Sequence, residues 1–124
     1  MNSTIDRNKP SGMTRLMKAF GNSMKGFVGV YKNEAAFRQE LLLAIILIPL
    51  GFYFGHNGLE RALLIGTVLL VLLVEILNSS IEAVVDRIGL ERHELSGLAK
   101  DLGSAAVFLA LVLVAVTWVL VLWR

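Results

Sequence analysis

The stretch ALLIGTVLLVLLVEILNSSIEAVVDR, residues 62–87, decides the fold. Its first half carries no charge before Glu75, and the part from Glu75 onward contains neither Gly nor Pro, the residues that disfavour helices most. The simplest interpretation is one long helix over residues 62–88 that crosses a membrane and continues beyond it, with Gly89 as its stop.

Polar residues in the second half of this stretch share one side of the predicted helix. They are Glu75, Asn78, Ser79, Glu82 and Asp86. At helical spacing they fit an arc of about 100°, and the carboxylates form a stripe about 16 Å long. An ionised acid in hydrocarbon costs about 2.5 kcal/mol or more, so a cation, a basic partner or protonation must compensate. The pattern favours a divalent metal that carries nucleotide phosphates, with a proton relay or a buried ion-pair network as the alternative.

Two more apolar segments complete the predicted membrane part, residues 35–55 and 103–123. The segment 103–123 has no charge and rises about 31 Å as a helix, which suffices for a bilayer core of about 30 Å. Pro49 predicts a kink in the segment 35–55, and residues 90–102 are predicted to form a polar connection. The expected fold is therefore an all-α polytopic membrane protein with three transmembrane helices.

Outside the main stripe, a few charged residues are further candidates. Glu34 and Glu40 lie near the start of the first membrane segment, where each could be a solvated interfacial charge. Glu34 gains importance only if packing brings it to Glu82. Lys100 could neutralise phosphate charge, or it could simply follow the preference for basic residues on the cytoplasmic side.

The N-terminal region is polar or amphipathic. Residues 1–11 are expected to be a poorly ordered tail. In residues 12–33 the apolar side chains fall within an arc of about 120°, opposite a basic face. This pattern predicts an amphipathic helix in the plane of an anionic membrane surface, and a helix packed on protein is the alternative.

Composition limits the class of protein. The chain has 124 residues, 56% of them hydrophobic and 18% charged, which is too apolar for a soluble domain of this size. It has no cysteine, and its net charge of +2 does not suggest a nucleic-acid partner. Seven basic residues precede the apolar run that begins at Leu41 and three lie in the 87–101 connection, against two on the other side, so the N-terminus and this connection are expected in the cytoplasm.

Several motifs together resemble the prokaryotic diacylglycerol kinase family. They are NEAAFRQE at 33–40, EILNSSIEAVVDR at 75–87 and HELSGLAKDLGSAAV at 93–107, and the resemblance covers about residues 13–123. It implies a homotrimeric helical bundle in the bacterial inner (cytoplasmic) membrane. Each subunit would have three transmembrane helices and a surface helix, and neighbouring subunits would share active sites.

The resemblance also implies roles for individual residues. Glu75 would be the general base and Asn78 would support it, while Glu34 and Glu82 would hold Mg²⁺ together with the co-substrate ATP. The implied ATP contacts are Arg15, Asn22, Glu34, Glu82, Glu91, Arg92, His93, Lys100 and Asp101. The implied lipid contacts are Ala19, Ser23, Tyr31, Arg38, Glu40, Glu75, Ser104 and Trp118. Asn22 and Met24 depart from the family pattern, which has aromatic residues there.

The expected function is ATP-dependent phosphorylation of membrane diacylglycerol to phosphatidic acid. The sequence has no G-x-x-x-x-G-K-[ST] loop and no G-x-G-x-x-G fingerprint, so carboxylates and metal must hold the nucleotide. An alternative is the same chemistry on undecaprenol. An alternative of another class is a small oligomeric cation channel or transporter, in which the acidic stripe is an ion path.

Overall fold

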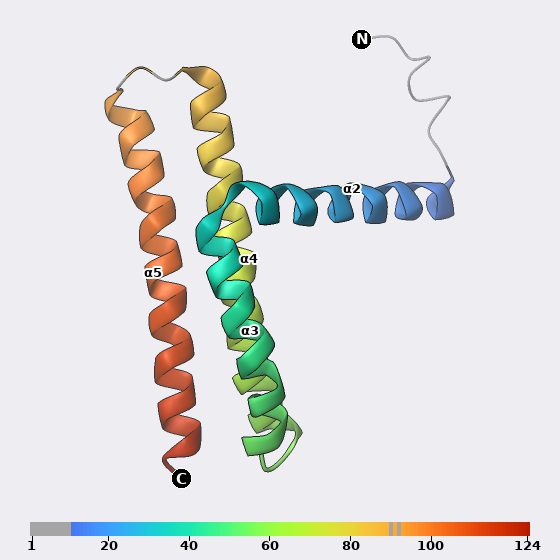
Figure 1. Ribbon diagram of the computed structural model, residues 1–124, viewed down its shortest axis with the longest axis vertical. Helices are drawn as coiled ribbons and strands as arrows, with labels where there is room; N and C mark the ends of the chain where they lie inside the picture. Colours follow the sequence, from blue (N-terminus) through green and yellow to red (C-terminus); the bar gives the residue numbers. More distant parts are fainter. Residues whose placement is uncertain (1–10, 90, 92) are drawn as a thin grey trace. The chain divides into compact units, whose positions relative to one another are not determined.

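The computed structural model describes residues 11–89, 91 and 93–124, and every regular element in this part of the chain is an α-helix (Figure 1). The helices are α2 (Gly12–Asn33), α3 (Ala35–Phe54), α4 (Gly58–Ile88) and α5 (Glu94–Leu122). By length and composition α3, α4 and α5 are each able to cross a membrane. The prediction of an all-α polytopic membrane protein is confirmed.

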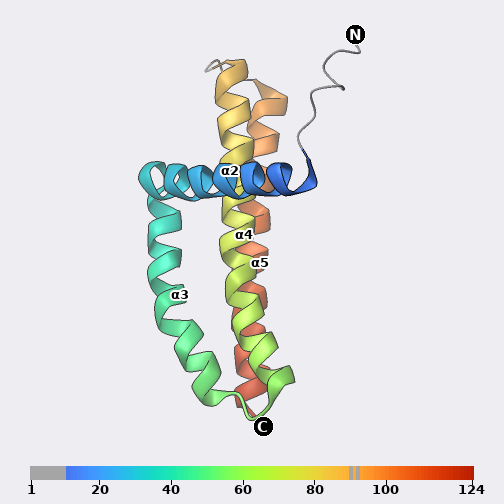
Figure 2. The same cartoon turned by 90° about the vertical axis from the view of Figure 1, so that its right-hand side faces the viewer.

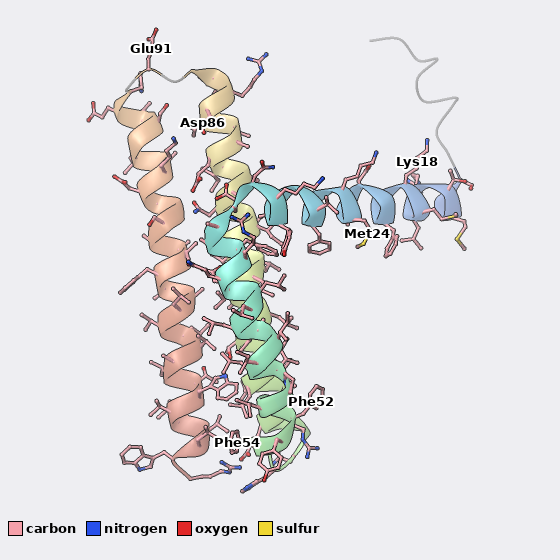
Figure 3. The ribbon with its side chains drawn as sticks, in the orientation of Figure 1. Lys18, Met24, Phe52, Phe54, Asp86 and Glu91 are labelled. Carbon is pink, nitrogen blue, oxygen red and sulfur yellow. The ribbon has the colours of Figure 1, made fainter. Side chains whose placement is uncertain are left out.

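The chain forms two compact units, one that ends at Asn33 and one that runs from Glu34 to Arg124. The first unit contains α2, whose bounds match the predicted surface helix. Met13, Leu16 and Phe20 are each about two-thirds exposed. Figure 3 shows Lys18 and Met24 on opposite sides of α2, as an amphipathic helix requires.

In the second unit, α4 packs against both α3 and α5 (Figures 1 and 2). Leu64, Val68 and Val71 of α4 are buried, as are Ala44 of α3 and Ala110 of α5. Small side chains let α3 and α5 approach α4 closely, and this close packing increases the dispersion contacts between the helices. α4 is therefore the central element of this unit. Its packing against α3 and α5 fixes how the helix is rotated, and thus where its polar side chains lie.

The helix α4 begins at Gly58, four residues before the predicted start at residue 62. Asn57 caps it, with Oδ1 accepting a hydrogen bond of 2.9 Å from the backbone N–H of Glu60. In return, Glu60 Oε1 accepts a hydrogen bond of 2.9 Å from the backbone N–H of His56. The pair resembles a capping box, which starts the helix in the polar turn rather than at the first apolar residue.

The predicted polar connection over residues 90–102 is wrong for most of its length. α5 begins at Glu94, where a connection and not a helix was expected, and not at residue 103. His93 caps it, with Nδ1 accepting a hydrogen bond of 3.1 Å from the backbone N–H of Leu95. Hydropathy marks where a helix enters the membrane, whereas this cap lies in the polar region before it.

The helix α3 ends at Phe54, one residue earlier than expected, because Gly55 takes an extended conformation. Pro49 lies inside α3, and Figure 2 shows the axis of this helix changing direction in its C-terminal half. A side chain at Gly51 would place Cβ 3.0 Å from Ile65 Cγ1 and 3.3 Å from Leu64 Cβ. A side chain at position 51 would therefore require Ile65 and Leu64 to shift by a few tenths of an ångström, so α3 and α4 are in close contact here.

Candidate active site

Four carboxylates interact in the upper part of the second unit. Glu75 lies on the α4 side of this group and is only 4% exposed. The charges of Glu34 and Glu82 act on Glu75, and the charge of Glu75 acts on Glu40. Glu34 and Glu82 therefore each act on Glu75, and an approach of Glu34 to Glu82 itself stays a prediction.

These acids come from two helices. Glu34 occupies the N-cap position of α3 but makes no capping hydrogen bond with its side chain, so its carboxylate is not used to start the helix. Glu40 follows on α3, and in the described part of the chain nothing hydrogen-bonds to its buried Oε2 atom. Concentrated negative charge with an unsatisfied buried oxygen is what a site for a cation or a hydrogen-bond donor requires.

Asn78 lies one turn of α4 beyond Glu75 and is 9% exposed. Its Nδ2 donates a hydrogen bond of 3.0 Å to Glu82 Oε1. The resemblance implied that Asn78 supports Glu75, whereas the hydrogen bond in the structure goes to Glu82. Asn78 therefore holds the carboxylate that the resemblance assigns to metal.

A pocket of about 460 Å³ opens where α4 ends and α5 begins. Lys100 Nζ lies at its edge, 2.8 Å from Asp86 Oδ1, and both side chains are about half exposed. Figure 3 shows Asp86 on the last turns of α4 and Glu91 in the connection above it. Three predicted ATP contacts, Glu91, His93 and Lys100, are therefore in one pocket. The full lining is Val85, Asp86, Gly89, Glu91, His93, Ser96, Gly97 and Lys100.

Other predicted residues have different surroundings. Trp118, a predicted lipid contact, donates a hydrogen bond of 3.0 Å from Nε1 to the backbone carbonyl of Leu64, and thereby joins α5 to α4. Ser104 is exposed on α5, about 21 Å from Trp118 along the helix axis. Arg38 on α3 and Asp101 on α5 are exposed as well.

The remaining predicted contacts belong to the first compact unit or lie outside the described residues. Arg15, Ala19, Asn22, Ser23 and Tyr31 all lie on α2, in the first compact unit. Arg92 lies outside the described residues. The structure thus gathers Glu34, Glu40, Glu75 and Glu82 in one group, and Glu91, His93 and Lys100 in another.

Comparison with known proteins identifies the family. The family model described as prokaryotic diacylglycerol kinase matches residues 21–122. The chain belongs to this family. Diacylglycerol kinase from Haemophilus influenzae is 54% identical over 110 residues, which cover 89% of this chain and 93% of the relative. Diacylglycerol kinase from Escherichia coli K12 is 51% identical over 116 residues, which cover 94% of this chain and 95% of the relative.

A third relative, diacylglycerol kinase from Pseudomonas aeruginosa, is 52% identical over 112 residues, which cover 90% of this chain and 91% of the relative. The resemblance noted in the sequence is therefore confirmed, and the protein is an enzyme of this kinase family. It is a membrane protein of a bacterial family, because three of its helices are long and apolar enough to span a bilayer.

A kinase of this family implies a divalent metal, and the donor set can be compared with that requirement. In the described residues, no three His, Cys, Asp or Glu side chains come close enough together to hold a metal ion. Mg²⁺ at phosphoryl-transfer sites is usually bound by one or two carboxylates together with substrate phosphates and water. Glu34 and Glu82, which both act on Glu75, supply carboxylate oxygens of the kind that such an arrangement uses.

Sequence reasoning missed two features of the site. One is the ion pair between Lys100 and Asp86, because Asp86 was placed on the acidic stripe but given no partner. The other is Gly103 of α5, which lies directly against Asn78. A glycine at the start of an uncharged membrane segment was the available signal, but its contact depends on how the two helices pack.

Proposed function

We propose that this enzyme transfers the γ-phosphoryl group of ATP to the free hydroxyl of membrane diacylglycerol, producing phosphatidic acid and ADP. The observation that carries the proposal is the burial of Glu75 among Glu34, Glu40 and Glu82. A carboxylate held in that position can accept a proton from a lipid alcohol that stays in the bilayer. The family and its relatives support the choice of lipid.

In the proposed reaction Glu75 takes the proton of the lipid hydroxyl. The hydroxyl oxygen forms a bond to the γ-phosphorus as the bond from that phosphorus to the bridging oxygen of ATP breaks, and ADP leaves with the electron pair. Little covalent chemistry falls to the protein, so positioning and electrostatics supply most of the rate enhancement. Burial of Glu75 keeps water away from the carboxylate and so favours the lipid alcohol over water as the group that reacts.

On the nucleotide side, Glu34 and Glu82 would hold Mg²⁺ with the phosphates of ATP, and Asn78 fixes the Glu82 carboxylate. When bound, Mg²⁺ neutralises phosphate charge during transfer. Lys100 lies in the neighbouring pocket, where its ammonium can exchange Asp86 for a phosphate oxygen. Both side chains of this ion pair are about half exposed to solvent, so the exchange costs little free energy.

The proposal is tested by incubating the purified protein in lipid bicelles with diacylglycerol, Mg²⁺ and ATP labelled in the γ-phosphate. We expect label in an organic-extractable product. Glu75→Gln keeps the size of the side chain but removes the proton acceptor, so we expect turnover to fall by a factor of about 100 or more. Normal turnover in this variant would contradict the role of Glu75, and ion flux without ATP consumption would favour a channel.

The same assay decides the lipid. Offered diacylglycerol and undecaprenol at equal mole fraction, the enzyme is expected to label phosphatidic acid first. Preferential labelling of undecaprenyl phosphate would overturn the substrate but leave the chemistry intact.

We also propose that the enzyme is a homotrimer in the bacterial inner membrane, with its N-terminus and the pocket near Lys100 facing the cytoplasm. The distribution of basic residues supports this orientation. Leu69, Leu73 and Leu77 of α4 are at least half exposed although α4 packs on two helices, which leaves room for another copy. The mass of the active protein in detergent, corrected for bound detergent, should be that of three chains, and an active monomer would refute the trimer.

A further inference from the structure

Gly103 is buried where α5 crosses the acidic part of α4. A Cβ atom at this position would overlap Asn78 Oδ1 and lie 3.1 Å from Asn78 Cγ. The overlap is far closer than any van der Waals contact, so Asn78 occupies space that a side chain at position 103 would need. Glycine at this position is required by the close approach and not by backbone conformation, because Gly103 lies within a regular helix.

The side-chain amide of Asn78 has a neighbour at each of its polar atoms. Its Nδ2 donates to Glu82 Oε1, and its Oδ1 faces the backbone of α5 at Gly103. Among the described residues, nothing donates a hydrogen bond to this buried Oδ1. A buried amide oxygen without a donor costs free energy, so the side chain keeps this orientation because packing and the bond to Glu82 hold it there.

We propose that Gly103 is a positioning residue that sets the orientation of Asn78 and, through it, of the Glu82 carboxylate. This proposal rests on the proposed role of Glu82 in holding metal and nucleotide. The bare backbone at position 103 forms the wall against which the amide lies. The amide then holds one carboxylate oxygen of Glu82 by a hydrogen bond, and this limits the directions in which the second carboxylate oxygen can point.

A methyl group at position 103 must change this arrangement. Asn78 can rotate away, or α4 and α5 can move apart, and both changes disturb the Nδ2–Oε1 hydrogen bond of 3.0 Å. Loss of a residue that orients a metal ligand typically costs about 10-fold to 100-fold in metal affinity or activity. The effect should therefore appear first on the nucleotide side of the reaction.

The test compares Gly103→Ala with Gly66→Ala in the full-length protein in lipid bicelles. Gly66 is a matched control on α4, because a Cβ added there meets nothing within 4 Å. We expect Gly103→Ala to raise the Mg²⁺–ATP concentration for half-maximal rate by about tenfold or more. The KM for diacylglycerol should stay within about twofold, because Glu82 is not among the proposed lipid contacts. Equal kinetics in the two variants would overturn the positioning role.

A second readout does not depend on activity. The free energy of unfolding in mixed detergent micelles is measured for wild type, Gly103→Ala, Asn78→Ala and the double variant. Truncating Asn78 removes the atoms that the new methyl would meet. Gly103→Ala should therefore lower the free energy of unfolding less in the Asn78→Ala background than in wild type. Additive losses would overturn the contact. If wild type shows no dependence on Mg²⁺–ATP, the proposed function fails while this coupling can still hold.

Discussion

Glu82 links the proposed metal site to the packing of the helices, because Asn78 donates a hydrogen bond to its carboxylate. Glu82→Gln keeps an oxygen that can accept from Asn78 but removes the charge that would bind Mg²⁺. We expect the Mg²⁺–ATP concentration for half-maximal rate to rise by about tenfold or more, with little change in the KM for diacylglycerol. Measuring the rate as a function of the concentration of each substrate separates these two constants. Glu94→Gln, an exposed change in the first turn of α5, serves as a control, and equal effects in both variants would contradict the assignment.

Single residues also show what sequence can and cannot predict about the site. The common face of Glu75, Asn78 and Glu82 follows from helical spacing alone and needs no knowledge of neighbours. The partner of Asn78 does not follow, since either Glu75 or Glu82 is within reach on the same helix face. The contact with Gly103 comes from another helix, so only the packed structure shows it.

At the level of elements, the interiors of the helices and the bounds of α2 were predictable, whereas the starts of α4 and α5 were not. Long apolar runs fix α3, α4 and α5 because uncovered backbone polar groups cannot enter hydrocarbon. The starts of α4 and α5 depend on caps made by Asn57 and His93, each a local hydrogen bond in a polar turn. Hydropathy does not detect such bonds, so the predicted starts fell inside the observed helices.

The length of α4 explains how one helix serves two environments. Its 31 residues span about 46 Å, well beyond a bilayer core of about 30 Å. Its first half can therefore cross hydrocarbon while its last turns line the polar pocket with Asp86. Glu75 and Glu82 lie between these parts, where the lipid hydroxyl and the nucleotide would meet in the proposed reaction.

Across the whole second unit, polar groups tie the helices together at the end opposite the pocket. Arg124 Nη2 donates a hydrogen bond of 2.7 Å to the carbonyl of Phe54 and lies 3.1 Å from Glu60 Oε1. Its Nε donates a hydrogen bond of 3.0 Å to His56 Nδ1. One guanidinium thus joins the end of α5 to the end of α3 and the start of α4. A lysine has no planar fork with which to make these bonds at once.

Arg124→Gln should therefore destabilise the fold without changing the chemistry. Charged hydrogen bonds of this kind contribute about 2 kcal/mol, which is the loss we expect in the free energy of unfolding measured in mixed detergent micelles. Turnover per folded molecule should stay close to wild type, because Glu60 and Glu82 are about 33 Å apart along α4. Arg61→Gln is the comparison, since exposed Arg61 joins α4 to α3 through Nε, which donates to the carbonyl of Phe52 at 3.1 Å, and we expect a smaller loss there than for Arg124. A larger loss of unfolding free energy in Arg61→Gln, or a fall in turnover with unchanged stability in Arg124→Gln, would show that Arg124 does not hold the helix ends together.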